Sequence, residues 1–513
     1  MPAIFGVVDL FAGPGGLGEG FSSLDVGGHS PFHVGISIEK EETAHRTLRL
    51  RAFLREYRAH HGRLPAAFVD FHAAPLREPD WASLDKNAWD SADEEARCLA
   101  LGTTEARAAV DKAIHDLRAR VDDTVLIGGP PCQAYSLVGR ARAKGKRDYV
   151  PENDERHYLF REYISVLDRL RPAAFVMENV KGMLSSTIES RLVFELLMED
   201  LASLGSGGGR VYELRAIRVQ DGRATLREAL QPADFIVKAE EFGVPQRRHR
   251  VSIVGVRSDI ASGIDAASIP VSSRIRTVAD AIAKLPRLRS GLSRIKDGAD
   301  AWSLIVADAA DELARMLKAD GEDGLSDALN SVVEELEGEI PGRISAELPD
   351  RYGAADDALL RWIERSELRA LAQHETRQHM AADLGRYLFA AVFGKVKGFS
   401  PKASRFPAML HPDHRNWTSG DFNDRFRVQL ATEPSTTITS HIAKDGHYFI
   451  HPDASQCRSL TVREAARLQT FPDDYLFLGN RTQQYVQVGN AVPPWLARQI
   501  AELVWQVLEK RSS

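Results

Sequence analysis

Short apolar segments alternate with helical stretches from residue 1 to about 257 of this chain. The alternation predicts βαβ units, and therefore an α/β fold with a doubly wound, mostly parallel sheet. In such sheets ligands bind beyond the carboxyl ends of the strands, so functional residues are expected at that edge. The predicted strands are Phe5–Asp9, His33–Ile38, Thr124–Ile127, Ala174–Met177, Phe235–Ala239 and Val251–Val256.

A glycine-rich run, Asp9 to Gly18, follows the first predicted strand. Glycines let a backbone pass close to a nucleotide, and the next helix offers free N–H groups at its start. Gly13, Gly15 and Gly18 have the spacing of a dinucleotide-binding fingerprint, and Glu39 stands where a ribose-binding acid is expected. The run alone leaves three interpretations open: an NAD site, an S-adenosylmethionine site and a plain strand–helix turn.

One of the three cysteines stands in an unusual loop. Cys98, Cys132 and Cys457 lie far apart without metal-type spacing, which predicts a reduced, cytoplasmic protein without a zinc site. Cys132 belongs to the run Gly129 to Gln133, where two prolines fix the loop after a predicted strand. A nearby helix start can lower the pKa of its thiol. The pattern favours a nucleophilic thiolate over a cysteine that packs as a small hydrophobe.

Two more polar runs follow predicted strands or lead into them. Glu178 ends a predicted strand, where a carboxyl group that is held protonated can donate to a ring nitrogen. The run 246–250 reads Gln-Arg-Arg-His-Arg, and strand alternation puts Gln246, Arg248 and Arg250 on one face. Taken singly, a surface acid and a solvated basic strand edge explain these runs equally well.

The order and spacing of these runs closely resemble the motif series of bacterial DNA cytosine-5 methyltransferases. The runs 463–469 and 487–493 belong to the same resemblance, which covers residues 4–257 and about 431–505. The Pro-Pro-Cys-Gln and Gln-Val-Gly-Asn-Ala-Val-Pro-Pro runs are highly specific to that family. The resemblance implies an S-adenosylmethionine-dependent methyltransferase domain of Rossmann-like type. Its expected division is a catalytic domain at 1–272, a target-recognition region at 273–430 and a return to the catalytic domain at 431–513.

The resemblance also implies covalent activation of a cytosine that is flipped out of duplex DNA. Cys132 would attack C6, and Glu178 would contact N3 and the exocyclic amine. Arg250, with Arg248 nearby, would hold O2, and S-adenosylmethionine would supply the methyl group to C5. No metal is expected. The cofactor positions carried over are Phe11, Gly13, Gly15, Glu39 (ribose hydroxyls), Asp70 (adenine amine), Pro131, Leu159, Asn490 and Ala491.

The middle of the chain has a different composition. Stretches at Asp300–Lys318, Gly324–Gly338 and Ala355–Ala372 have helical apolar spacing and many acidic side chains. Acidic helices are repelled by phosphates, so this acidic insert, 300–372, is expected to pack outward or against a partner.

Contacts with double-stranded DNA are expected instead from Lys395–Trp417 and Arg425–Arg427, and from a basic loop, Gln133–Asn153, that would close over the base. The net charge of −6 excludes bulk electrostatic binding to nucleic acid, but it allows one positive cleft. The expected protein is a monomer with no membrane partner. A restriction endonuclease or another defence-system protein that acts on the same site is its expected partner.

Three other functions compete with this one. They are methylation of RNA by the same chemistry, a catalytically dead regulatory homologue and a nicotinamide-dependent oxidoreductase. The long variable segment favours DNA over RNA, and the intact Cys132, Glu178 and paired arginines argue against a dead homologue. An oxidoreductase leaves the prolines before Cys132 unexplained. The sequence does not reveal the DNA sequence that is recognised.

Overall fold

The computed structural model describes residues 4–130, 159–188, 191–202, 204, 211–272, 274–353, 357–412 and 424–510. Cys132 and Pro131 lie outside them, as does the basic loop 133–153. The chain folds into two compact units. Unit 1 comprises 1–65, 80–275 and 491–513, and unit 2 comprises 66–79 and 276–490. Along the chain, unit 1 gives way to unit 2 after residue 275 and resumes at Ala491, and the expected functional division at 272 and 431 stays a prediction.

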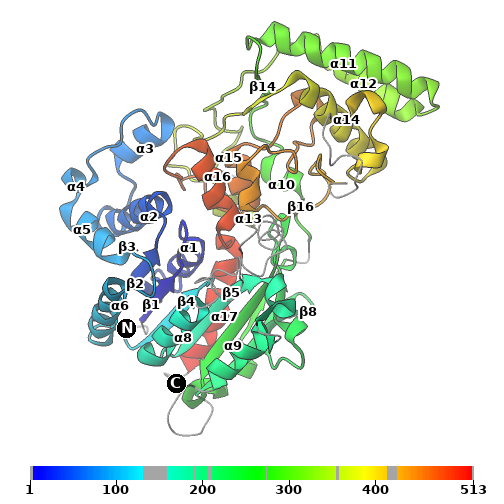
Figure 1. The fold of residues 1–513 in the computed structure, drawn as a ribbon. Coiled ribbons are helices and arrows are strands. Elements are labelled where there is room, and N and C mark those ends of the chain that lie inside the picture. The colour runs from blue at the N-terminus through cyan, green and yellow to red at the C-terminus, as the bar shows by residue number, and fades with distance from the viewer. Residues whose placement is uncertain are drawn as a thin grey trace. The chain divides into compact units, whose positions relative to one another are not determined.

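Unit 1 is built on a ten-stranded mixed sheet (Figure 1). Its strands lie in the order β3-β2-β1-β4-β5-β12-β8-β9-β13, with β10 also beside β12. The sheet is parallel from β3 to β5 and antiparallel beyond β5. The predicted doubly wound α/β fold is confirmed, with an antiparallel extension added. The strands of this sheet are β1 Phe5–Leu10, β2 Phe32–Glu39, β3 Ala96–Cys98, β4 Asp123–Gly128, β5 Ala174–Val180, β8 Tyr212–Gln220, β9 Arg223–Arg227, β10 Ile236–Lys238, β12 His249–Arg257 and β13 Ser268–Pro270. The short strands β6 Thr187–Ile188, β7 Arg191–Leu192 and β11 Gln246–Arg247 lie outside it.

Each face of this sheet carries its own apolar core, because alternate residues of a strand point to opposite faces. Phe5 and Val7 of β1 pack with α1 and α17, whereas Val8 and Leu10 pack with α6, α8 and α9. The helices of unit 1 are α1 Gly16–Ser22, α2 Glu42–His61, α4 Trp81–Leu84, α5 Lys86–Glu95, α6 Thr104–Arg118, α8 Leu159–Leu170, α9 Val193–Ala202 and α17 Pro494–Glu509.

Helix α17 lies directly against α1 because two glycines leave out side chains at the crossing. A Cβ atom on Gly20 would lie 2.3 Å from Cβ of Ala497, and one on Gly16 would lie 2.2 Å from the carbonyl oxygen of Val492. Close packing of this kind does not tolerate an added carbon. The glycine-rich run therefore serves helix packing as well as the loop after β1.

Unit 2 contains the acidic helical hairpin. The two helices predicted at 300–338 are α11, Ala299–Ala319, and α12, Asp323–Leu336. They pack on α14, Ala381–Lys397, around a core that includes Trp302 and Leu388. The acidic insert therefore has an apolar side buried in its own unit. The other elements of unit 2 are α3 Ala66–Ala73, α10 Val278–Ile282, α13 Ala358–Ile363, α15 Val462–Leu468, α16 Arg481–Asn490, β14 Gly291–Leu292, β15 Gln378–His379 and β16 Ser435–Thr436.

The predicted helix at 355–372 is wrong over most of its length, since only α13 is helical there. The chain becomes extended at Glu364, with φ −77° and ψ 145°. Polar contacts hold it there: the Glu364 carboxylate accepts from the N–H of Gly353 at 2.8 Å, and the N–H of Arg365 donates to the Tyr352 hydroxyl at 3.1 Å. Specific side-chain bonds thus override the helical spacing of the apolar residues.

The Arg-rich run at 463–469 forms a buried framework in unit 2. Arg467 donates to both carboxylate oxygens of Asp473, at 3.0 and 2.6 Å, and Arg463 donates to the carbonyl groups of Ala372 and Tyr475. Both arginines are at most 1% exposed. Buried charges persist only when they are paired in this way, so the run fixes loops of unit 2.

Candidate active site

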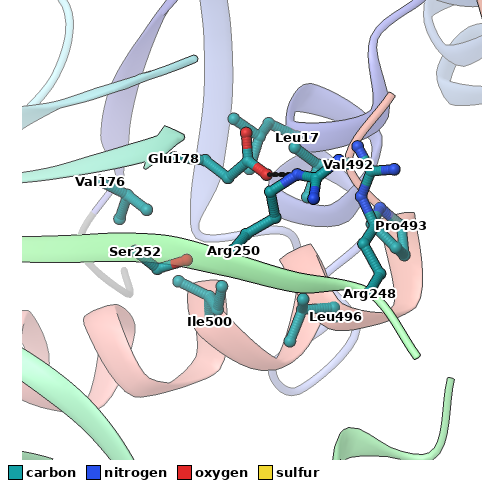
Figure 2. A pocket seen from close by; sticks show the side chains of 10 residues that line it. All are labelled: Leu17, Val176, Glu178, Arg248, Arg250, Ser252, Val492, Pro493, Leu496 and Ile500. Carbon is teal, nitrogen blue, oxygen red and sulfur yellow. Dashed lines mark ion pairs between the residues drawn. The ribbon is translucent and has the colours of Figure 1, made fainter. Parts of the chain in front are cut away.

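Glu178 and Arg250 face one another from neighbouring antiparallel strands (Figure 2). Nε of Arg250 lies 3.2 Å from Oε1 of Glu178, and the two side chains are 17% and 15% exposed. The register of β5 and β12 places Ser252 opposite Glu178, so all three side chains lie near the end of β5. The ion pair is sheltered but still reachable from a small cavity.

Arg248 lines the same cavity and is 4% exposed. Burial first, and then the cation of Arg250, lower its pKa to about 9, while Glu178 opposes the change. The guanidinium group still carries its charge at neutral pH. One carboxylate therefore shares the cavity with two cations, and the surplus positive charge suits a carbonyl oxygen of a ligand. The rest of the lining is Leu17, Val176, Ser252, Val492, Pro493, Leu496 and Ile500.

The segment that leads to Cys132 begins beside Glu178. A Cβ atom on Gly129 would lie 3.4 Å from both the carbonyl oxygen and Oε2 of Glu178. The side-chain amide of Asn179 donates to the carbonyl oxygen of Pro130 at 3.0 Å. The parallel pairing of β4 with β5 brings these two strand ends together. The chain is therefore anchored next to Glu178 two residues before Cys132.

The loop after β1 has the backbone of a ligand cradle. Phe11, Gly13 and Gly15 have positive φ angles of 59°, 58° and 100°. The carboxylate of Glu39 accepts from the N–H of Gly13 at 2.8 Å and from that of Glu41 at 2.7 Å. A Cβ atom on Gly13 would meet nothing within 4 Å, so open space borders the loop. Burial raises the pKa of Glu39, although these two N–H groups oppose the change.

Asp9, at the end region of β1, is a buried acid to which the sequence motifs assign no role. It is 0% exposed, and neither carboxyl oxygen has a hydrogen-bond partner among the described residues. A Cβ atom on Gly18 would lie 3.1 Å from its Oδ2. Burial, together with Glu95 and Glu39, raises the pKa of Asp9 well above its ordinary value. It therefore lies against the first turn of α1 as a carboxyl group that readily holds a proton.

Comparison with known proteins decides the family. The model of the C-5 cytosine-specific DNA methylases matches residues 109–298 and 361–505. The chain belongs to this family. A type II methyltransferase of Bacillus paralicheniformis is 32% identical over 523 residues, covering 98% of this chain and 99% of the relative. A DNA (cytosine-5-)-methyltransferase of Aeropyrum pernix is 29% identical over 410 residues, or 76% of this chain and 82% of the relative.

The fold agrees with that of a solved structure. A chain described as a DNA modification methyltransferase encoded within an E. coli prophage superposes with a TM-score of 0.53, at 17% identity and 98% and 99% coverage. The family predicted from the motifs is confirmed, and the enzyme is an S-adenosylmethionine-dependent DNA (cytosine-5-)-methyltransferase. The oxidoreductase alternative is thereby excluded. No described helix is long and apolar enough to cross a membrane.

The methyltransferase positions expected for the cofactor do not all gather in unit 1. Phe11, Gly13 and Gly15 lie in the loop after β1, and Glu39, at the end of β2, accepts from the N–H of Gly13. Leu159 begins α8, and buried Ala491 opens the last segment of unit 1. Asn490 ends α16 and belongs to unit 2.

Asp70 also belongs to unit 2, where it stands in the middle of α3. Its side chain is 68% exposed and lies 3.3 Å from Nη1 of Arg369. The residue whose backbone N–H bonds to the carbonyl oxygen of Glu39 is Leu99, at 3.0 Å, in the segment after β3. Asp70 thus lies in a helix and not at the end of a strand, and its contact with the adenine amine stays a prediction.

The described residues contain one cluster of potential metal ligands, and it does not line the cavity. Nδ1 of His60 and Nε2 of His61 lie 2.8 and 3.0 Å from the same oxygen of Asp85. The other oxygen of Asp85 accepts from the N–H of Ala88 and caps α5. The bonds from both histidines to Asp85, and its capping of α5, explain why these three residues lie together without a metal ion.

Proposed function

We propose that the enzyme methylates C5 of one cytosine within a specific double-stranded DNA sequence, through a covalent bond between Cys132 and C6 of a flipped-out base. The observation that carries the proposal is the Glu178–Arg250 pair, 3.2 Å apart, beside the strand end that leads to Cys132. A duplex buries the edge of the pyrimidine that these groups would contact, so the base must leave the stack.

Each side chain has one task in this scheme. The thiolate of Cys132 adds to C6. The Glu178 carboxyl group contacts N3 and the exocyclic amine, so that negative charge does not build up on the ring. Arg250, with Arg248 beside it, holds O2. The methyl group passes to C5, the C5 proton leaves to a base, and elimination of Cys132 restores the aromatic ring.

The cofactor side of the proposal rests on the loop after β1. S-adenosylmethionine supplies an electrophilic methyl group when bound. Glu39 would accept from the ribose hydroxyls with the lone pairs that Gly13 and Glu41 leave open. Pro131, Leu159, Asn490 and Ala491 would complete its pocket, and the protein's own groups, without a metal ion, would carry the chemistry.

A role in a restriction-modification system is supported by the relatives. The relative in Bacillus paralicheniformis is a type II methyltransferase that aligns over almost the whole chain. We infer that the enzyme protects a DNA site that a restriction endonuclease, or another defence protein, would otherwise attack. It would act as a monomer, because one copy carries every group in the scheme.

Bisulfite sequencing of DNA from cells that express the enzyme tests this function directly. The expected result is methylation of one cytosine within a fixed sequence context, and its loss in a Cys132→Ser variant. Purified enzyme should transfer a methyl group to duplex DNA and not to tRNA. Methylation by Cys132→Ser at the wild-type rate, or transfer to tRNA alone, would overturn the proposal.

A further inference from the structure

A basic groove in unit 2 contributes nothing to the chemistry described above. It has a volume of about 410 Å³, and four of its nine lining residues are Arg343, Arg377, Lys444 and Arg481. Only one carboxylate, that of Glu375, lies among the other residues of the lining. The chain as a whole has a net charge of −6, so this local excess of positive charge runs against its composition.

The guanidinium groups of the groove are held in place by backbone carbonyl groups. Arg377 donates to the carbonyl oxygens of Lys444, at 3.2 Å, and Ile442, and its guanidinium carbon lies 4.0 Å from the centre of the Tyr485 ring. Arg481 donates to the carbonyl oxygen of Thr376 at 2.5 Å. Such bonds orient the cations. Arg481 is also paired with Glu375, whose Oε1 lies 3.3 Å from its Nη2, whereas Arg377 and Lys444 have no acid paired with them among the described residues. A ligand anion would find the guanidinium groups already positioned, which reduces the entropy lost on binding.

The segment that follows the acidic hairpin supplies Arg343. Its guanidinium donates to Thr376 at 3.2 Å and to Asp297 at 3.3 Å. A Cβ atom on Gly291 would lie 2.5 Å from Nε of Arg343, so a glycine makes room for it. The Nε atoms of Arg343 and Arg377 are both buried and lack a hydrogen-bond acceptor among the described residues. Buried donors are seldom left in this state unless a ligand or water completes them.

We infer that this groove binds the phosphate backbone of duplex DNA, and so we call it the phosphate groove. Three arginines and a lysine suit phosphate oxygens, and exposed Thr482 in the first turn of α16 adds a hydroxyl donor. The inference rests on the proposed function for the choice of polyanion. It assigns to Arg343, which lies inside the acidic insert after α12, a contact with DNA.

The test uses Lys444→Gln with Arg481→Gln, two changes that remove charge from partly or fully exposed side chains of the groove. Affinity for a short duplex of arbitrary sequence is measured against salt concentration. Each lost phosphate contact lowers the slope of log K against log salt by about 0.9, so a fall of about 2 and at least a tenfold weaker affinity are expected. Lys444→Gln alone should give about half of this change in slope and guards against misfolding of the double variant.

The matched control is Arg315→Gln with Lys318→Gln, which removes two exposed cations from α11 of the same unit. It should leave affinity and slope nearly unchanged. An unchanged slope in the groove variant, or an equal fall in the control, would overturn the inference.

Methyl transfer by the same variants separates this inference from the proposed function. The groove variant should raise KM for DNA and keep kcat, because none of its residues lines the cavity at Glu178. If the wild type methylates DNA and the groove variant has an unchanged KM, the inference about the groove alone is overturned. Groove-dependent DNA binding by a wild type that methylates no cytosine would overturn the proposed function alone.

Discussion

The cavity of unit 1 and the phosphate groove of unit 2 both gather arginines, but in opposite ways. In the cavity, Arg248 is 4% exposed and Arg250 17%, beside a single carboxylate. In the groove, Arg481 is 38% exposed, and its guanidinium group donates to the carbonyl oxygen of Thr376 and pairs with Glu375. Burying a charge is costly, so the cavity suits a small group held for chemistry, whereas the groove suits a polyanion in water. Burial and pairing, more than the number of arginines, therefore separate the two roles.

A third basic region, 395–427, bears on this comparison because three of its six described lysines and arginines are paired with acids. Lys397 lies 2.7 Å from a Glu322 oxygen, and Arg427 lies 2.6 Å from Asp424. Arg425 lies 3.6 Å from Asp445. We expected DNA contacts here from the sequence, and residues 413–423 lie outside the described structure. The groove has the same share of paired cations, since Arg343 pairs with Asp297 and Arg481 with Glu375. The carbonyl groups that orient its arginines, and not a larger number of unpaired charges, therefore distinguish the groove.

The largest expected effect belongs to the cavity. Glu178→Gln keeps the shape of the side chain but cannot change its protonation state, so kcat should fall by roughly 10²- to 10⁴-fold. DNA affinity and its salt slope should stay within about twofold, because the amide removes no cation. Steady-state methyl transfer and a salt titration measure the two quantities. The control is Glu241→Gln, which removes the carboxylate that pairs with Lys238 outside the cavity. If the DNA affinity of Glu178→Gln falls as far as its kcat, the cavity also binds DNA, and the assignment of chemistry to the cavity and of DNA binding to the groove is contradicted.

A change at the crossing of α1 and α17 should destabilise unit 1. Gly20→Val places side-chain carbon where Ala497 already stands, and overpacking of this kind typically costs about 1–3 kcal/mol. Thermal unfolding should show a lower transition temperature. Gly298→Ala is the control, since its φ of −172° is extended and a Cβ atom there meets nothing within 4 Å. Equal melting of the two variants would contradict this packing of α17 on α1.

Acidification should change the stability of the two units differently, because burial shifts the pKa values of the histidines in unit 2 and of the acids in unit 1 in opposite directions. Burial lowers the pKa of His72, His374 and His451 in unit 2 to about 4. The stability they contribute is fully present above their ordinary pKa of 6.5 and is lost as the pH falls toward 4. In unit 1, burial raises the pKa of Asp9 and Glu39, so the folded unit takes up protons before the unfolded chain does.

Hydrogen exchange, corrected for the intrinsic rate at each pH, measures this difference segment by segment. Between about pH 7 and pH 5, protection should fall in unit 2 and hold in unit 1. His45, whose pKa is also lowered by burial, opposes the trend in unit 1, so the expected contrast rests on the three histidines of unit 2. A fall that is equal in both units, or larger in unit 1, would contradict the assignment.

The smallest expected effect concerns the region 395–427. Neutralising Lys395, Lys397, Lys402 and Arg405 together removes twice the charge of the groove double variant. It should nevertheless lower the salt slope by less, roughly one unit, because we infer that the phosphate backbone contacts the groove and because Lys397 is paired with Glu322. The salt titration used for the groove measures it. A larger fall in slope than that of the groove variant would reverse the comparison and restore this region as the main DNA contact.

The sequence predicted best the features that local pattern determines. Alternating apolar segments located the strands that carry Glu39, Glu178 and Arg250. The ends of the parallel strands β2 and β5 lie at one edge of the sheet, and β12 starts at that edge because it is antiparallel to β5. The β8–β9 hairpin was missed, although Asp221 and Gly222, with φ of 50° and 70°, are a turn signal that periodicity ignores.

The phosphate groove could not have been predicted in this way. Its four cations are single residues spread from Arg343 to Arg481, and only tertiary packing brings them together. The opposite error occurred at 355–372, where apolar spacing predicts a helix that bonds from Tyr352 and Glu364 prevent. Local pattern thus describes strand ends well and tertiary polar contacts poorly.

The packing of α17 on α1 has a consequence for the enzyme's synthesis. Leu17 lines the cavity early in the chain, whereas Val492, Pro493 and Leu496 close it from the last segment of unit 1. During translation the glycine loop and Glu178 are therefore made long before Val492, Pro493 and Leu496, which complete the lining of the cavity. Newly made enzyme cannot mark DNA until translation has reached these residues, so the onset of methylation lags behind the first appearance of the polypeptide.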